Sequence, residues 1–162
     1  MKNIEFDKQK TIAFTGHRNM DCNPVLLKEE LIHIIREQYH IGYATFITGC
    51  AIGFDILAAE VVLELQKEYI GIQLFCAVPH AGHHLYFSNE DRQRYIRIAD
   101  KATSNILLSS QYYDGCFLRR NDYMIANCSL LIAYYNSPQR SGTAYTVRRA
   151  QANNIPIINL YK

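Results

Sequence analysis

Three short segments of the sequence combine glycine with side chains that bind anions. Their candidate ligand-binding residues are Gly16, His17, Arg18, Gly49, Cys50, Gly53, Asp55, Ser141, Gly142 and Thr143. Each segment follows a short apolar run and precedes a stretch of helical spacing. Glycine lets the backbone approach a ligand closely, and the first N–H groups of a helix bind phosphate oxygens. The pattern therefore predicts a binding site for a phosphate-bearing ligand.

The first two segments each allow a structural interpretation as well. Arg18 offers a planar fork to phosphate or carboxylate, but a turn glycine followed by a solvated arginine is also common. Gly49 and Gly53 are four residues apart, and neither a Walker lysine nor the spacing of a dinucleotide-binding loop accompanies them. Asp55 either binds a ribose hydroxyl or caps the backbone amides of its own loop.

The third segment and a fourth one complete the candidate site. Ser141 and Thr143 can donate to phosphate oxygens at a helix start, although a simple helix cap explains them equally well. Arg120 and Asn121 lie in a run that precedes another apolar stretch, and they either face the ligand or belong to a surface charge cluster. Several such loops at one edge of a sheet favour a phosphate site more than any single loop does.

The elements that position these segments alternate between short apolar runs and longer runs of helical spacing. We expect strands at 11–16, 44–49, 72–78, 104–110, 129–135 and 155–160, and helices in most of the intervals between them. The apolar runs lack the alternation of half-exposed strands, so both faces of the sheet need cover. The sequence predicts an α/β fold, a Rossmann-like three-layer sandwich with a mainly parallel sheet of about six strands. No linker divides residues 1–162, so we expect a single domain.

Composition excludes several classes of protein. Seventeen basic and fifteen acidic residues give a net charge of +2, which is a weak bias toward nucleic acid or acidic membranes. The apolar runs are short, so no membrane association is expected, and the first residues do not form a secretory signal. Five scattered cysteines without a CxxC motif argue against a disulfide framework. We expect a cytoplasmic protein without a cofactor or a bound metal.

Four motifs in this order resemble the YpsA-like branch of the SLOG superfamily of Rossmann-like domains. They are TGHR, GCAIGFDILAAEVVLEL, RRNDYMIANCSLLIAYY and SGTAYTVRRA, which extend over nearly the whole chain. The last two are also similar to the DprA domain. The resemblance implies a nucleotide or nucleotide-derived ligand, and it implies ligand contacts from the glycine loops, Arg120 and Asn121.

Two departures from the family pattern affect the expected site. The third loop usually opens with two glycines, whereas Ser141 takes the first place here. The position after the fifth strand is often acidic in the family, but here it is Asn136. This residue lacks the carboxylate that a metal or ribose contact there would use.

The leading hypothesis is a sensor that binds the small molecule without strong catalysis. The related Lonely-guy phosphoribohydrolases carry glutamates after their glycine turn, whereas Thr143 is followed by Ala144. Hydrolysis of an N-glycosidic or phosphoester bond is the alternative, with Asp55 and Glu60 as substitute acids. A third hypothesis, by analogy with DprA, is single-stranded nucleic-acid binding; this is not favoured by the net charge. It would use the cations Arg119, Arg120, Arg140, Arg148 and Arg149.

Other reactive residues have simpler explanations. The HxxHH spacing of His80, His83 and His84 can offer two imidazoles, whereas a tetrahedral zinc site needs three or four ligands. We expect these histidines in an exposed loop beside the cleft. A catalytic pair of Cys50 and His17 would need a thiol whose pKa is lowered by a helix N-terminus. The segment 85–87 is apolar and aromatic and could form a lid or the interface of a homodimer.

Overall fold

Strands and helices alternate along the whole chain in the computed structural model, which describes residues 4–136 and 141–162. Within these ranges the strands are β1 (Thr11–Gly16), β2 (Thr45–Thr48), β3 (Gln73–Val78), β4 (Ser104–Leu107), β5 (Leu130–Tyr134) and β6 (Ile157–Asn159). The helices are α1 (Pro24–Ile41), α2 (Phe54–Gln66), α3 (Asn89–Lys101), α4 (Cys116–Ala126) and α5 (Gly142–Ala152). Short 3-10 helices, η1 (Lys8–Lys10) and η2 (His83–Tyr86), precede β1 and α3.

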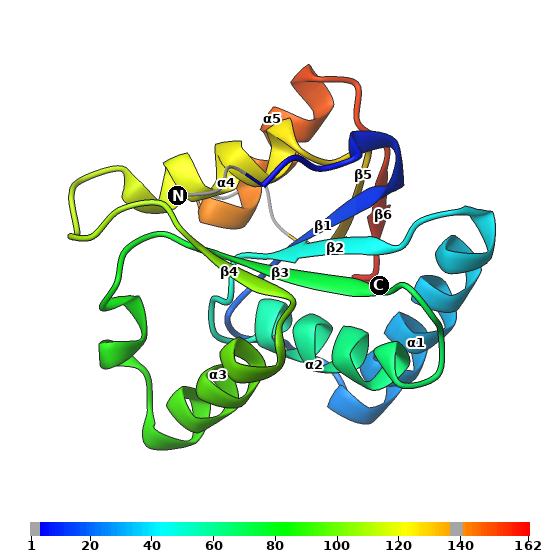
Figure 1. Ribbon diagram of the computed structural model, residues 1–162, viewed down its shortest axis with the longest axis horizontal. Coiled ribbons are helices and arrows are strands. Elements are labelled where there is room, and N and C mark those ends of the chain that lie inside the picture. The colour runs from blue at the N-terminus through cyan, green and yellow to red at the C-terminus, as the bar shows by residue number, and fades with distance from the viewer. Residues whose placement is uncertain (1–3, 137–140) are drawn as a thin grey trace.

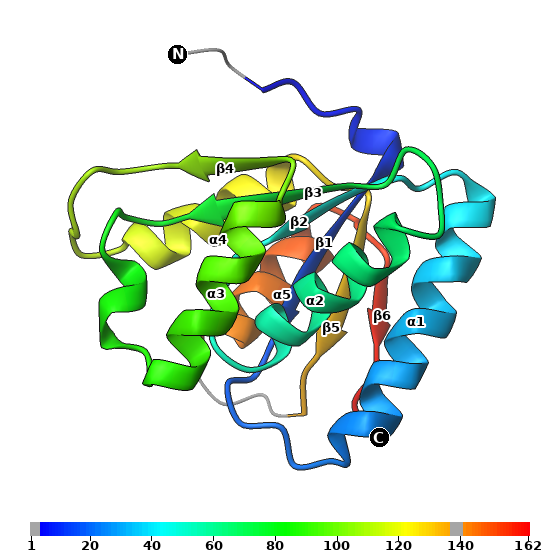
Figure 2. The ribbon, with the colours of Figure 1, turned by 60° about the horizontal axis from the view of Figure 1, so that its bottom comes forward.

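The strands form one sheet in the order β4-β3-β2-β1-β5-β6, with every described pair parallel. Helices α1, α2 and α3 cover one face, and α4 and α5 cover the other (Figures 1 and 2). This arrangement confirms the predicted Rossmann-like sandwich. A parallel sheet needs crossover connections, and the helices that make them bury both of its faces.

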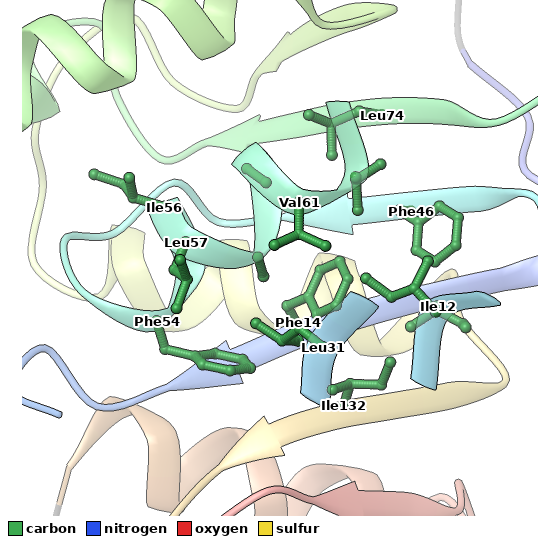
Figure 3. Close-up of a cluster of buried hydrophobic side chains, with 14 of the residues drawn as sticks. Ile12, Phe14, Leu31, Phe46, Phe54, Ile56, Leu57, Val61, Leu74 and Ile132 are labelled. Carbon is green, nitrogen blue, oxygen red and sulfur yellow. The ribbon is translucent and has the colours of Figure 1, made fainter. Parts of the chain in front are cut away.

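Alternate residues of the central strands face two separate cores. Ile12 and Phe14 of β1 pack with Phe46 and α1 and α2 in the larger core, which Figure 3 shows. Ala13 faces the second core, beneath α4 and α5, together with Leu131 of β5. All of these side chains are fully buried, and Thr11 and Thr15 of β1 are buried as well, so neither face of the strand meets solvent.

Edge strands are shorter than the sequence pattern predicts. β4 ends at Leu107 and β6 spans Ile157–Asn159, although apolar residues continue on either side. Each of these strands pairs on one side only, and β4 alternates between half-buried and exposed residues. An edge strand makes fewer hydrogen bonds to neighbouring strands and is less buried than a central strand, so it ends earlier. Local sequence propensity shows neither effect.

The strand order creates a crevice at the carboxyl end of β1. The chain runs outward from β1 to β4 and then returns to β5 on the other side of β1. The helix that follows β1, α1, and the helix that follows β5, α5, therefore lie on opposite faces of the sheet (Figure 2). Ligands of open α/β sheets bind at such a switch point.

Candidate functional site

A cavity of about 390 Å³ lies at this switch point, and we call it the glycine-lined pocket. Its lining residues are Thr15, Gly16, His17, Arg18, Ala51, Asp55, Phe117, Leu118, Arg120, Asn121, Ser141, Gly142 and Thr143. Parts of all the predicted segments therefore meet in one place. Three of the predicted residues, Gly49, Cys50 and Gly53, do not line the pocket.

Gly49 supports the pocket from behind through Arg120. The Arg120 guanidinium donates from Nη1 to the Gly49 carbonyl at 2.7 Å. A Cβ atom at Gly49 would lie 2.9 Å from the Cδ of Arg120, so a larger residue would displace the arginine. Arg120 is 6% exposed, which separates it from the surface charge cluster considered as an alternative.

Asn121 extends this contact to the third loop. Its Oδ1 accepts from Arg120 Nε at 2.8 Å, and its Nδ2 donates to the Gly142 carbonyl at 3.5 Å. The pair on α4 thus joins the loop after β2 to the start of α5. These bonds use Nε and one Nη1 N–H, which leaves further donors of the guanidinium for a ligand.

Gly53 joins the loop after β1 to the start of α2. It has φ +88°, and a Cβ atom there would overlap the Arg18 carbonyl. The Phe54 N–H donates to the His17 carbonyl at 3.3 Å, and the His17 N–H donates to the Tyr134 carbonyl at 3.2 Å. Close backbone contact, and not ligand approach, is what requires glycine at this position.

Cys50 and His17 are not arranged as a catalytic pair. Cys50 is fully buried, and the neighbouring Cys76 together with burial raises the pKa of its thiol well above the usual range. The lowered thiol pKa that a catalytic pair would need is therefore not found at Cys50. The Nε2 atom of His17 accepts from the Asn136 N–H at 3.1 Å and is occupied by that contact.

The two carboxylate oxygens of Asp55 fit the two roles that the sequence left open, a cap for its own loop and a ligand contact. Its Oδ2 accepts from the Ala51 N–H at 3.4 Å, which is the structural role. Its Oδ1 is buried, lacks a hydrogen-bond partner among the described residues, and belongs to a side chain that lines the pocket. Burial raises the pKa of Asp55 to about 6, although the positive charges of Arg120 and Arg18 oppose this shift.

Two helices begin at the pocket, as the sequence predicts. Ala51 and Asp55 belong to the loop and first turn of α2, and Ser141 to Thr143 form the start of α5. The Ser141 Oγ accepts from the Ala144 N–H at 3.0 Å, so this residue is a helix cap as well as a pocket residue. Both helix starts bring positive dipole ends to the same cavity.

A second cavity of about 520 Å³ adjoins the first, and we call it the aromatic chamber. It is lined by Arg18, Ala51, Ile52, His80, Gly82, His83, Leu85, Tyr86, Phe87, Tyr112, Phe117 and Arg120. The sequence placed the histidines in an exposed loop, but His80 and His83 are buried. The missed signal is the density of aromatic residues in segments 80–87 and 112–117, which only the fold brings together.

Several other predictions concern absences or surface groups. Among the described residues, no cluster of three or more His, Cys, Asp or Glu side chains could hold a metal ion. No helix in residues 4–136 and 141–162 is long and apolar enough to cross a bilayer.

Of the cations predicted for nucleic acid, Arg120 is buried and Arg149 pairs with Asp122 at 3.1 Å. Arg140 lies outside the described residues.

Two DNA processing proteins are among the solved structures with a similar architecture. A DprA of Helicobacter pylori, solved for its single-stranded DNA binding mode, superposes with a TM-score of 0.66 and 24% identity, over 96% of this chain and 67% of that one. DprA of Streptococcus pneumoniae gives 0.65 and 18%, over 94% of this chain and 50% of the other. These similarities show that the two proteins share the Rossmann-like fold of this chain.

The sequence comparisons are more specific. The model of the YpsA family, described as the YspA SLOG family, matches residues 12–157, so this chain belongs to the YpsA family of SLOG proteins. UPF0398 proteins are similar: one of Staphylococcus epidermidis is 23% identical over 84% of this chain and 78% of its own. One of Streptococcus mutans is 25% identical over 91% and 90%. The predicted family resemblance is confirmed.

Gly53 and Gly71 provide a matched test of the contact between the first two loops. Both have a positive φ, +88° and +87°, but a Cβ atom at Gly71 would meet nothing within 4 Å. Gly71→Ala should lower the free energy of unfolding by ~1–2 kcal/mol for the backbone alone. Gly53→Ala should cost a further ~1–3 kcal/mol, through overlap with Arg18 and because its ψ of −124° lies outside the left-handed region. Equal losses in urea denaturation would show that the loops are not in contact.

Asp55 should make stability depend on pH. The raised pKa means that the folded protein holds the Asp55 proton more tightly than the unfolded chain does. The stabilising effect of this proton is therefore complete below pH ~4 and is lost as the pH rises through about 6. Over this pH range the free energy of unfolding should fall by ~3 kcal/mol. Asp55→Asn should remove this loss between pH 4 and 7. Asp100→Asn, at an exposed site on α3, is the control; a parallel pH profile for Asp55→Asn and wild type would contradict the prediction.

Proposed function

We propose that this protein binds a nucleotide or nucleotide-derived small molecule in the glycine-lined pocket and lacks strong catalysis. One observation carries the proposal: Arg18, Arg120 and the N-termini of α2 and α5 converge on the same cavity. Family membership supports the same class of ligand. Five free cysteines are consistent with action in the cytoplasm, which is also part of the proposal.

The electrostatics of the pocket favour an anion. Each helix start contributes a partial positive charge, and a guanidinium holds a phosphate through paired N–H···O bonds. Arg18 is exposed and free to adapt to a ligand, whereas Arg120 is fixed by its contacts to Gly49 and Asn121. Burial of Arg120 strengthens its attraction for phosphate because water screens it less.

The available carboxylates support binding over hydrolysis. Glycosidic hydrolysis commonly uses two carboxyl groups that flank the bond. The first turn of α5 has no acidic residue, and Asp55 is the only carboxylate in the described lining of the pocket. Glu60 pairs with Arg94 on α3 instead. Hydrolysis therefore remains the alternative, with Asp55 as its general acid; release of base from nucleoside monophosphates or ADP-ribose would establish it.

Arg18 should be a phosphate ligand that can be removed without loss of the fold. In a panel of nucleoside monophosphates and ADP-ribose, we expect Arg18→Gln to weaken binding by ~1.5–3 kcal/mol. Affinity for the corresponding nucleosides should hardly change, since they lack phosphate. Arg119→Gln removes the same charge from an exposed site outside the pocket and is the control. Equal effects of the two variants in calorimetric titrations would contradict a phosphate contact.

Gly142 tests the third loop separately. A Cβ atom there would have Asn121 Nδ2 as its nearest neighbour, at 3.8 Å, so the fold has room for a side chain. Gly142→Val should nevertheless place methyl groups where a ligand approaches the helix start. We expect a loss of nucleotide binding of at least tenfold and a thermal midpoint within a few degrees of wild type. Equal loss of binding and stability would indicate a purely structural loop.

Single-stranded nucleic acid is the second candidate ligand. The observation in its favour is the shared fold with DprA of H. pylori, whose structure concerns single-stranded DNA binding. Within the described residues, two exposed cations of the predicted group form no ion pair, Arg119 and Arg148. A labelled oligonucleotide should then bind with an affinity that falls steeply with salt, and Arg119→Gln should reduce it.

A further inference from the structure

The aromatic chamber and the glycine-lined pocket share part of their walls. Arg18, Ala51, Phe117 and Arg120 line both cavities. The two cavities are therefore neighbours, and a ligand whose phosphate contacts the two arginines lies at the edge of the chamber. The chamber is also the larger cavity, at about 520 Å³ against about 390 Å³.

Aromatic rings form much of the chamber wall. The His80 ring lies edge-on to Tyr112 and Phe117, with centroids 5.5 and 5.8 Å apart. The Arg120 guanidinium carbon lies 5.5 Å from the centre of the Phe117 ring, at the boundary with the pocket. Such walls favour a flat, polarisable ring over an aliphatic or strongly charged group.

His83 supplies polar atoms to this apolar environment. It begins η2, is 5% exposed, and packs edge-on to Tyr95 and Phe87 with centroids 4.8 and 5.5 Å apart. Neither ring nitrogen has a hydrogen-bond partner of ordinary geometry within the described residues, although the Cys50 backbone lies nearby. Burial and the charge of Arg120 lower the pKa of His83 to about 4, so the ring is neutral near pH 7.

A neutral imidazole carries one donor and one acceptor. Leaving both unpaired in a buried site is unfavourable, so a bound group that pairs with either gains free energy there. Nitrogen heterocycles combine a flat ring with donors and acceptors along its edge. A plain hydrocarbon would fit the aromatic walls but would leave His83 unpaired.

We propose that the aromatic chamber binds the heterocyclic base of the nucleotide and that His83 hydrogen-bonds to the edge of that base. The inference rests on the proposed function, because it assumes that the phosphate of the same molecule occupies the glycine-lined pocket. Arg18 and Arg120 then lie at the junction between the phosphate and base compartments. The occupant of the chamber sets which nucleotide is preferred.

The test compares ribose 5-phosphate, which has no base, with AMP, GMP, CMP and UMP in calorimetric titrations. At least one nucleotide should bind ten times more tightly than ribose 5-phosphate. His83→Phe should reduce that nucleotide's affinity by about tenfold and leave ribose 5-phosphate unchanged. His84→Phe is the matched control, since His84 stacks on Tyr95 at 5.0 Å but does not line the chamber.

A second pair of variants covers the case in which His83→Phe does not fold. Tyr112 is 60% exposed and lines the chamber, whereas Tyr113 is 39% exposed and does not. Tyr112→Ala should weaken the preferred nucleotide without affecting ribose 5-phosphate, and Tyr113→Ala should weaken neither.

The outcomes separate this inference from the proposed function. Equal affinities of ribose 5-phosphate and all four nucleotides for the wild-type protein would overturn the base compartment and leave the phosphate site standing. Equal loss of both ligand types in His83→Phe and Tyr112→Ala would overturn it as well. If neither ribose 5-phosphate nor any nucleotide binds, the proposed function itself fails.

Discussion

The buried guanidinium of Arg120 holds two of the ligand loops in place, and the shape of the site depends on it. One side of the group donates to the Gly49 carbonyl, and the other donates to Asn121, which reaches Gly142. Loss of the arginine would leave a buried carbonyl without its donor, at a cost of ~1–3 kcal/mol. The same group also faces both cavities. In the proposed site, Arg120 would therefore both support the loops and contact the ligand. Arg18 makes no such supporting side-chain contact among the described residues, so a substitution there tests ligand binding more directly.

The charges around the pocket are only partly balanced. Arg120 and Asp55 are both buried, yet no ion pair joins them among the described residues. Two arginines and two helix starts exceed one carboxyl group whose pKa is already raised to about 6. An incoming phosphate would balance this excess and would favour the protonated form of Asp55. This excess of positive charge supports the proposed anion ligand, and the paired carboxylates of many glycosidases are absent from the described lining of the pocket.

The two proposed ligands, a small nucleotide and a single nucleic-acid strand, share the chemical groups that the two adjoining cavities would bind. A phosphate beside an aromatic compartment suits a free nucleotide, and it equally suits one unit of a single strand that passes over the surface. The similarity to DprA of H. pylori is at 24% identity and concerns the fold. A net charge of +2 and the pairing of Arg149 with Asp122 offer little general attraction for a polyanion. The weak surface charge therefore favours the small molecule over the strand.

The sequence by itself determined the layered fold, the family and the loops that meet at the sheet edge. Continuous apolar runs such as β1 require cover on both faces, and glycines at strand ends identify the turns. Tertiary structure alone decided what each loop residue does: Gly53 is needed because the Arg18 backbone packs against it, and Cys50 is an inert thiol because Cys76 and burial raise its pKa. His83, which the sequence predicts in an exposed loop, is buried and lines the aromatic chamber. Burial and long-range contact set these roles, and both depend on residues distant in the chain that local patterns do not encode.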